Sequence, residues 1–473
     1  MSDTITIQGA VLERSDAARP YADSQPISIS ELELTAPGEG EILVKITAAG
    51  ICHSDLSVVN NNRPRPLPML LGHESAGVVE EVGPGVSKVK VGDHVVMTFL
   101  PRCGECDGCK TDGKMPCEVG SKTNNEGTLI RGTRHLTRNG ETVQHHLGVS
   151  GFATHAVVSE LSVVPIGSDV PADIAAIFGC AILTGGGAIL NEIDPKPEDS
   201  IAVVGLGGVG MSAIITAAAL GVKEIVGIDM QADKCAKAIE LGATDAMTPA
   251  EAEASGKKFT AVVEAAGHPK ALETAYKITG PGGLTVTVGL PAPGSTITID
   301  PLVMTGEARR VHGCYLGSSV PTKDIPKYEQ LWREGKLNAE GSSPATSSLP
   351  ISTRPWTTSL RAWHCVRSSS STNSRSAPAR GVRQSRNRVS SAVAGLHVFH
   401  QIGISCLIPH PSLKIIRHRR HWLSLNRASA KNLRTGRPVL STFACRLSTT
   451  ASSGRTTPKV CSCASSTLAP FRS

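Results

Sequence analysis

One uncharged stretch of 22 residues, Ile201–Val222, constrains the fold of this 473-residue chain more than any other segment. It is long enough to cross a bilayer as a single apolar helix. Five glycines interrupt it, however, and three of them form the pattern Gly205-x-Gly207-x-x-Gly210 between an apolar run and an alanine-rich run. A glycine turn between a strand and a helix is typical of a buried βα unit that binds a dinucleotide. We therefore predict a βα unit here and no membrane span.

Strand and helix patterns continue to alternate after this turn. The expected elements are a strand at Ile201–Val204 and then, in order, Glu224–Asp229, Asp233–Leu241, Thr260–Glu264, Pro269–Thr279 and Leu284–Val288. Such alternation predicts a doubly wound parallel sheet with helices on both faces. The fold class is therefore α/β in this part of the chain.

The residues expected to bind the dinucleotide lie at the ends of the first two strands. The glycine turn contributes Gly205, Gly207, Gly208, Val209 and Gly210. Its backbone can approach a pyrophosphate closely, and the helix N-terminus favours the negative charge. Asp229 ends the second strand and would accept hydrogen bonds from the adenosine ribose, which favours NAD over NADP because a carboxylate repels a 2′-phosphate. Lys234 either flanks the same ribose or is a solvated charge on the helix.

Residues 1–180 have a different pattern, which is mostly β. Ile42, Val44 and Ile46 alternate with other residues as in a half-buried strand. Turn sequences such as Gly83-Pro84-Gly85 delimit further short strands, including Gly77–Val82 and His94–Met97.

A cysteine-rich loop interrupts this β-rich part. Its four cysteines have the spacing C-x2-C-x2-C-x7-C and are Cys103, Cys106, Cys109 and Cys117. No secretory signal is visible at the N-terminus, which favours reduced thiols over disulfides. Four thiolates at such spacing are typical of a closed, structural zinc site, and a pair of disulfides is the alternative.

A second set of possible metal ligands is dispersed along the chain. Cys52, His73 and Cys180 offer two thiolates and one imidazole, which suit Zn²⁺. A single Cys or His is more often a core residue, so the prediction rests on the combination. Three protein ligands leave one zinc position open to an alcohol oxygen, and Zn²⁺ then acts as a Lewis acid. An open zinc site beside a dinucleotide site predicts metal-assisted hydride transfer.

Three polar residues next to these ligands have possible catalytic roles. Ser54 is two residues from Cys52 and can accept the alcohol proton, or its hydroxyl only stabilises a turn. Asp55 is placed to hold the second ring nitrogen of His73, or it forms an Asx turn. Glu74 follows His73 directly and either tunes the zinc or forms an ion pair.

The net charge of +7 conceals two unlike segments. Residues 341–473 contain 17 Arg, 3 Lys and no Asp or Glu, so that this Ser/Arg-rich tail carries +20 and residues 1–340 carry 7 − 20 = −13. The absence of acidic residues over such a length is far from ordinary usage. A basic nucleic-acid-binding segment is one interpretation, although a charge of +20 without a fold or an aromatic platform offers only salt-sensitive, non-specific attraction. We expect instead that the tail is disordered.

The genetic code gives a more specific hypothesis for the tail. Trp356-Thr357 requires the codons TGG-ACN, and reading one base earlier gives GAC, which encodes aspartate. In the same way Ser352–Ser359 can be re-read as Ile-Asn-Glu-Ala-Met-Asp-Asp-Leu. We infer a one-base slip of the reading frame near Gly341. Sequencing of the genomic DNA and the transcript tests this, and a coding strand that cannot encode the re-read segment contradicts it.

Together, these motifs resemble the zinc-dependent medium-chain alcohol dehydrogenases over about residues 5–340. The resemblance implies a GroES-like catalytic domain at residues 1–184 with a structural zinc lobe at about 100–120, a Rossmann NAD-binding domain at 185–330, and at 331–340 the start of a truncated return to the catalytic domain. It implies a catalytic zinc on Cys52, His73 and Cys180 and a structural zinc on the four-cysteine loop. It places His53 near the cofactor pyrophosphate, Ser54 in the proton relay and Thr184 beside the nicotinamide.

Three features of the chain refine this resemblance. The long stretch Gly127–Ser159 is similar to the animal-type and glutathione-dependent formaldehyde-oxidising branch. Many relatives carry a relay histidine five positions after the first ligand cysteine, where this chain has Ser57. The re-read segment resembles the usual end of the family, so the return of the chain to the catalytic domain is replaced here.

These observations predict an NAD-dependent, zinc-dependent alcohol dehydrogenase with two zinc ions per chain. Within that class, oxidation of S-hydroxymethylglutathione is the first alternative. A polyol dehydrogenase is less favoured because Cys180 is a thiolate where many polyol enzymes use a carboxylate. The alternative from another class is a catalytically impaired product of the disrupted reading frame. The resemblance also implies a cytoplasmic homodimer or homotetramer, without a membrane or a specific nucleic acid as partner.

Overall fold

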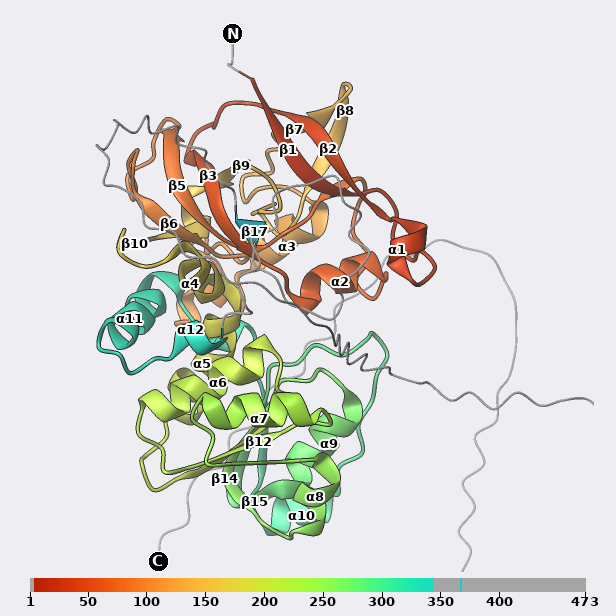
Figure 1. Cartoon of the computed structure of the whole chain (residues 1–473), viewed down its shortest axis with the longest axis vertical. Helices are drawn as coiled ribbons and strands as arrows, with labels where there is room; N and C mark the ends of the chain where they lie inside the picture. The colour runs from red at the N-terminus through yellow and green to blue at the C-terminus, as the bar shows by residue number, and fades with distance from the viewer. Residues whose placement is uncertain (1–3, 343–365, 368–473) are drawn as a thin grey trace, which may run out of the picture. The chain divides into compact units, whose positions relative to one another are not determined.

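The computed structural model describes residues 4–342 and 366–367, which fall within one compact unit (Figure 1). Three sheets organise this part of the chain. The first is a closed barrel in the order β1-β2-β7-β8-β4. The second is a six-stranded sheet in the order β10-β6-β5-β3-β17, whose sixth strand, β9, also pairs with β3. The third is a six-stranded parallel sheet. The predicted fold class, a GroES-like β domain followed by a Rossmann sheet, is confirmed. The prediction of disorder for the tail falls almost entirely outside the described residues.

Apart from β17, the first two sheets are built from short strands that precede residue 170. Their bounds are β1 Ile5–Leu12, β2 Ile27–Leu34, β3 Glu41–Gly50, β4 Met69–Leu70, β5 Glu74–Val82, β6 His94–Met97, β7 Leu136–Arg138, β8 Glu141–His145, β9 His155–Ser159 and β10 Val163–Ile166. Short helices connect them, namely α1 Tyr21–Ser24, α2 His53–Val59, η1 Gly108–Thr111, α3 Glu118–Glu126 and η2 Glu160–Ser162.

Strand β3 differs from the sequence prediction in its burial. Alternation of Ile42, Val44 and Ile46 indicated one buried and one exposed face. Leu43, between them, is buried as well, because β3 lies inside its sheet and packs on both sides. Val44 and Ile46 belong to one hydrophobic cluster and Leu43 to another. The alternation of residues shows which side chains share a face of the strand. Whether other side chains cover the opposite face depends on the tertiary structure.

The parallel sheet has the strand order β13-β12-β11-β14-β15-β16, and every neighbouring pair is parallel. Its strands are β11 Ser200–Val204, β12 Glu224–Ile228, β13 Asp245–Met247, β14 Phe259–Glu264, β15 Thr279–Thr287 and β16 Arg310–Gly313. The helices between them are α6 Gly208–Ala219, α7 Ala232–Glu240, α8 Pro249–Ala254, α9 Pro269–Ile278 and α10 Pro301–Gly306.

Strand β11 shows why this sheet has helices on both faces. Ile201 and Val203 share a hydrophobic cluster with Met211 and Ile214 of α6, whereas Ala202 and Val204 share another with residues of α8 and α9. Successive side chains of a strand point to opposite faces, so a strand covered on both sides is apolar throughout. The uncharged stretch Ile201–Val222 is therefore a buried βα unit, as predicted.

A continuous helical segment, Ala172–Ile193, leads from the β-rich part towards the parallel sheet. It consists of α4 Ala172–Ile177, the π-helix η3 Phe178–Ile182, α5 Leu183–Gly187 and the π-helix η4 Ala188–Ile193. Among the described residues it is the one helix long and apolar enough to span a membrane, but 89% of its apolar window is buried inside the protein. It is a core helix, and the predicted domain boundary at residue 184 falls within it.

The described chain ends with elements that return from the parallel sheet towards the helical segment. These are η5 Leu316–Ser318, α11 Pro321–Arg333, α12 Ala339–Ser342 and the two-residue strand β17 Val366–Arg367, which pairs with Ala48–Ala49 of β3. Leu337 and Ala339 are buried in the same hydrophobic cluster as Cys180.

Candidate active site

Three elements that are distant in sequence bring the three predicted catalytic ligands together. Cys52 precedes α2, His73 lies between β4 and β5, and Cys180 lies in the π-helix η3. The Sγ atoms of Cys52 and Cys180 are 4.0 Å apart, and the Sγ atom of Cys180 is 3.6 Å from Nε2 of His73. All three ligand atoms lie within 4.8 Å of one another. A π-turn inside an α-helical segment is frequently found at a functional site, as here at Cys180.

These distances fit a zinc ion. Tetrahedral coordination with Zn–S of about 2.3 Å and Zn–N of about 2.0 Å places two sulfurs about 3.8 Å apart and a sulfur and a nitrogen about 3.5 Å apart. The observed separations of 4.0 and 3.6 Å agree with these values. The donor set of two thiolates and an imidazole is one that Zn²⁺ prefers.

Asp55 fixes the orientation of the imidazole ligand. Its Oδ1 atom lies 3.1 Å from Nδ1 of His73, which leaves Nε2 directed at the sulfurs, and its Oδ2 atom accepts a hydrogen bond from the backbone N–H of Cys52. Burial raises the pKa of Asp55, but the charge of His73 and contacts with His146 and His73 outweigh it, so that the pKa lies well below its usual range. The geometry matches the predicted contact of Asp55 with the second ring nitrogen.

His146 lies next to this site, and the sequence analysis assigned it no role. It follows β8 and is buried, and its Nδ1 atom lies 3.2 Å from the same Oδ1 atom of Asp55. Its ring meets the ring of His73 edge to face at 5.5 Å between centroids. The only signal in the sequence was a pair of histidines in the loop Gly127–Ser159, which has no regular spacing to the ligands.

Glu74 lies behind the ligand set and is buried. Its Oε1 atom accepts a hydrogen bond from the backbone N–H of Ala181 at 3.2 Å. Burial raises the pKa of Glu74 to about 8, with a further rise from the negative charge of Cys52. Among the described residues, no ion pair of Glu74 is found, so the predicted alternative of an ion-pair partner has no support.

This pKa predicts a pH dependence of stability for the zinc-free protein. Because the pKa of Glu74 is near 8 in the folded state and 4.5 is its ordinary value, the folded chain binds a proton between these values that the unfolded chain releases. The free energy of unfolding should therefore be highest below pH 4.5, as far as Glu74 contributes, and fall as the pH rises to about 8. After a chelator has removed the zinc, the decrease in Tm between pH 5 and pH 8 should be about 3 °C smaller in Glu74→Gln than in the wild type. Calorimetry at pH 5 and 8 measures it, and parallel declines in the two proteins would contradict the assignment.

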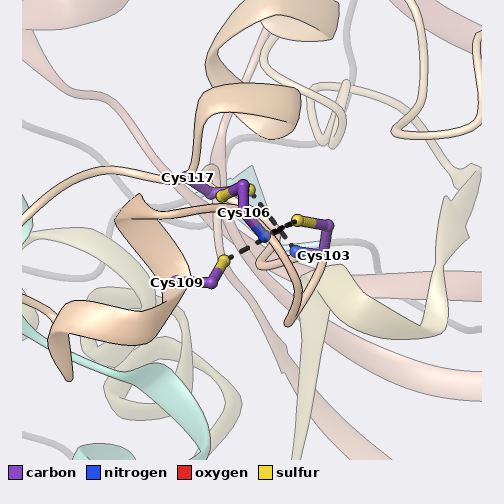
Figure 2. Close-up of side chains that lie close together, drawn as sticks. All are labelled: Cys103, Cys106, Cys109 and Cys117. Atoms are coloured by element: carbon purple, nitrogen blue, oxygen red, sulfur yellow. Dashed lines mark hydrogen bonds between the residues drawn. The ribbon is translucent and has the colours of Figure 1, made fainter.

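The four cysteines of the second set also converge (Figure 2). The Sγ atoms of Cys103 and Cys109 are 3.8 Å apart, and those of Cys106 and Cys117 are 3.9 Å apart. Both distances match the value of about 3.8 Å expected for two sulfurs on one tetrahedral zinc. The backbone N–H groups of Cys103 and Gly120 donate to Sγ of Cys117, which stabilises a thiolate. The set is closed, as a structural site requires.

The tip of this zinc lobe contacts residues that precede and residues that follow the parallel sheet. Lys114 pairs with Glu192 at 3.1 Å, and Lys323 of α11 pairs with Asp112. A Cβ atom on Gly113 would lie 2.2 Å from the carbonyl oxygen of Ser318, so the two backbones are in close contact. The lobe thus supports the segment around Ser318.

The glycine turn has the geometry of a phosphate cradle. Gly205 has a φ of +94°, and a Cβ atom on Gly210 would lie 1.9 Å from the carbonyl oxygen of Gly205. In contrast, a Cβ atom on Gly207 would meet nothing within 4 Å, so space is open in front of the N-terminus of α6. Backbone N–H groups at a helix N-terminus favour an anion in such a space. Gly208 and Val209 form the first turn of this helix.

The other predicted cofactor residues lie close to this turn. Asp229 accepts hydrogen bonds from the backbone N–H groups of Leu206 and Gln231, and Lys234 lies 3.8 Å from its Oδ2 atom. Thr184 is buried in α5, and a Cβ atom on its neighbour Gly185 would lie 2.0 Å from the carbonyl oxygen of Val209.

The start of α2 faces a cavity. His53 is exposed there, and it lines a cavity of about 360 Å³ together with Ser57, Asn62, Arg63, Gly267, His268, Pro269, Leu290, Pro291, Ala292 and Ser295. Ser54, next to His53 in the first turn, is half-buried. Ser57 donates from Oγ to the carbonyl oxygen of His53 at 3.0 Å.

Comparison with known proteins agrees with this geometry. Residues 38–168 match the family model of the alcohol dehydrogenase GroES-like domain, and residues 208–334 match that of the zinc-binding dehydrogenases. The chain is 35% identical over 342 residues to an NDMA-dependent alcohol dehydrogenase from Amycolatopsis methanolica, which covers 69% of this chain and 91% of the relative. The chain belongs to the zinc-dependent medium-chain alcohol dehydrogenases. It is therefore an oxidoreductase that acts on alcohols in a reaction linked to a nicotinamide cofactor.

Solved structures of alcohol dehydrogenases share its architecture. An alcohol dehydrogenase zinc-binding domain protein from Burkholderia ambifaria has a TM-score of 0.67 and 31% identity, and the match covers 74% of this chain and 93% of that one. A benzyl alcohol dehydrogenase from Acinetobacter calcoaceticus has a TM-score of 0.67 and 29% identity, with coverage of 77% and 99%. The predictions of a zinc-dependent alcohol dehydrogenase with a catalytic and a structural zinc site are confirmed at the level of the family and the two ligand sets.

Proposed function

We propose that this alcohol dehydrogenase transfers hydride from a primary or secondary alcohol to NAD at the site formed by Cys52, His73 and Cys180. The observation that carries the proposal is the convergence of these three ligand atoms, 3.6 and 4.0 Å apart, from three separate elements. With two thiolates and one imidazole as ligands, a tetrahedral zinc keeps one position for the substrate.

The residues around the ligands have distinct roles in this proposal. Zinc, when bound, acts as a Lewis acid that makes the alcohol more acidic. Ser54 accepts the alcohol proton at its hydroxyl, and Asp55 holds His73 in the orientation that directs Nε2 to the sulfurs. Ser57 has its hydroxyl bonded to a backbone carbonyl within α2, which supports a relay that passes from Ser54 to solvent without it.

We assign the cofactor to the glycine turn and the cavity next to it. The open space at Gly207 accepts the diphosphate at the N-terminus of α6. His53 and His268 line the cavity and can donate hydrogen bonds to the same diphosphate. Thr184, four residues after Cys180, is the proposed neighbour of the nicotinamide, and Asp229 with Lys234 binds the adenosine ribose.

Asp229 predicts the preference for NAD. Asp229→Asn keeps the size of the side chain but removes the charge that repels a 2′-phosphate, so the ratio of kcat/KM for NAD over NADP should fall about 30-fold, as expected for about 2 kcal/mol from hydrogen bonds to a charged group. Steady-state kinetics with both cofactors measure this ratio. Asp245→Asn, at an exposed carboxylate of β13, is the charge-matched control and should leave the ratio unchanged. An unaltered ratio in Asp229→Asn would exclude this residue from cofactor selection.

The test of the proposed function is the appearance of NADH absorbance with ethanol, with benzyl alcohol and with formaldehyde plus glutathione. Benzyl alcohol is included because the relative from Acinetobacter calcoaceticus is named for it. Turnover of a simple alcohol supports the proposal. Turnover only with formaldehyde plus glutathione supports the second candidate, S-hydroxymethylglutathione, which the long segment Gly127–Ser159 favours. Two bound zinc ions without turnover of any substrate would identify an impaired product of the disrupted reading frame.

We also propose the arrangement that the resemblance implied, with a catalytic domain at residues 1–184, a Rossmann domain at 185–330 and a cytoplasmic homodimer or homotetramer. Sedimentation of the zinc-loaded protein measures the oligomeric state. A monomer at all concentrations would contradict this part of the proposal.

A further inference from the structure

Two arginines between α2 and β4 lack the acidic partners that partly buried cations usually have. Arg63 and Arg65 are both half-buried. Among the described residues, no ion pair joins either guanidinium to a carboxylate. The Nε atom of Arg65 is buried without a hydrogen-bond partner, and its remaining bond is a long one of 3.4 Å to the carbonyl oxygen of Pro64. An unpaired cation away from water costs free energy, so this place favours an anion.

Arg63 lines the cavity next to His53, the residue that follows the ligand Cys52. Burial raises the pKa of Tyr315, and the charge of Cys180 raises it further, whereas the charges of Arg63 and Arg65 lower it. The ring of Tyr315 contacts Phe99 edge to face at 6.0 Å between centroids. Phe99 in turn contacts the ligand His73 at 5.6 Å. Ring contacts therefore join Tyr315 to the ligand His73 through Phe99, and the charges of both arginines act on the Tyr315 hydroxyl.

Among the described residues, the cavity that Arg63 lines carries no opposing charge. None of the residues that line the cavity next to His53 is acidic. This is unusual in a chain whose residues 1–340 carry a net charge of −13. A cationic spot in an otherwise acidic body attracts an anion selectively.

We propose that Arg63 and Arg65 bind an anionic group of the substrate, so that the preferred alcohols carry a carboxylate several bonds from the hydroxyl group. The planar guanidinium matches a carboxylate with two parallel hydrogen bonds, and such bonds to charged groups are about twice as strong as neutral ones. Tyr315 and Phe99 provide the apolar wall between the carboxylate and the carbon that loses hydride. This inference rests on the proposed alcohol oxidation and adds the substrate class.

A matched pair of substrates tests the proposal. Benzyl alcohol and 4-(hydroxymethyl)benzoate differ only in the carboxylate, so the ratio of their kcat/KM values isolates its contribution. The zinc-loaded enzyme should prefer the carboxylate at least about tenfold, and Arg65→Met should reduce that ratio about tenfold. Arg65→Lys, which keeps the charge, should restore part of it. Arg131→Met removes an exposed arginine that pairs with Glu39 and serves as control with an unchanged ratio.

Two further measurements distinguish a substrate-binding role of the arginines from a cofactor-binding role. If the arginines bind the cofactor diphosphate instead, Arg65→Met raises the KM for NAD and leaves the substrate ratio unchanged, which overturns the proposal. Calorimetric binding of benzoate to the zinc-loaded protein needs no turnover, so its loss in Arg65→Met supports the anion site even if alcohol oxidation fails. Equal affinity of the wild type for benzoate and benzamide would also overturn it.

Discussion

Replacing Cys52 by serine should lower kcat/KM for alcohol oxidation by about a thousandfold or more and reduce the zinc content from two ions per chain to one. Serine is a poor zinc ligand, and the remaining pair, His73 and Cys180, cannot hold the ion tightly. A loss of about 4 kcal/mol of transition-state stabilisation corresponds to this change in rate, and Lewis acids contribute several kcal/mol. Atomic absorption and steady-state kinetics on the same preparation measure both effects.

A control for this experiment is available within the chain. Cys235 lies in α7 outside both ligand sets, and its thiol contacts the carbonyl oxygen of Asp229. Cys235→Ser should retain two zinc ions. The assignment of the catalytic ligands would be wrong if Cys52→Ser kept both ions and an undiminished rate.

Replacing Cys106 by serine should have the largest effect on stability. A structural zinc site contributes about 10–16 kcal/mol of apparent binding free energy in small peptides, and part of it is lost when one of four thiolates is removed. We expect a decrease in Tm of about 10 °C and the loss of one zinc ion, while the ion on Cys52, His73 and Cys180 remains. Differential scanning calorimetry with zinc analysis measures both.

The lobe contacts predict a secondary effect on catalysis. The tip of the lobe lies against Ser318, three residues after Tyr315, so disorder of the lobe should raise KM for the alcohol. Lys323→Gln removes only the exposed ion pair with Asp112 and should change Tm by less than about 2 °C, because exposed pairs contribute about 0–1 kcal/mol. A change in Tm as small in Cys106→Ser as in Lys323→Gln would show that the zinc has no structural role.

Much of the site was predictable because its signals are local. The spacing of the four cysteines lies within one loop, and the glycine turn is bounded by an apolar strand and an alanine-rich helix, so short-range geometry specifies both. The strand His94–Met97 has the predicted bounds, whereas β15 begins five residues before its predicted start at Leu284, because pairing with β14 extends it. Strand pairing is a tertiary interaction that residue alternation does not report.

Other parts of the site have no local signal. Cys180 is 107 residues from His73 in the chain, and only the packing of η3 against the β-rich part brings their ligand atoms within 3.6 Å. His146 reaches Asp55 because β8 pairs with β4 in the barrel. Arg63 and Arg65 lie in an irregular segment, and only the tertiary structure shows that no carboxylate of residues 4–342 pairs with them.

The amino-acid sequence by itself determined the chemistry of this protein: which residues can bind zinc, which turn can bind a dinucleotide, and that the chain alternates strands and helices after residue 200. Only the tertiary structure decided which ligands share an ion, that β3 is buried on both faces, and that Arg63 and Arg65 have no carboxylate partner within the described part of the chain. The physical reason is the distance along the chain over which each property is set. Backbone conformation and ligand type are properties of neighbouring residues, whereas coordination, burial and electrostatic pairing depend on atoms that meet only after the chain has folded.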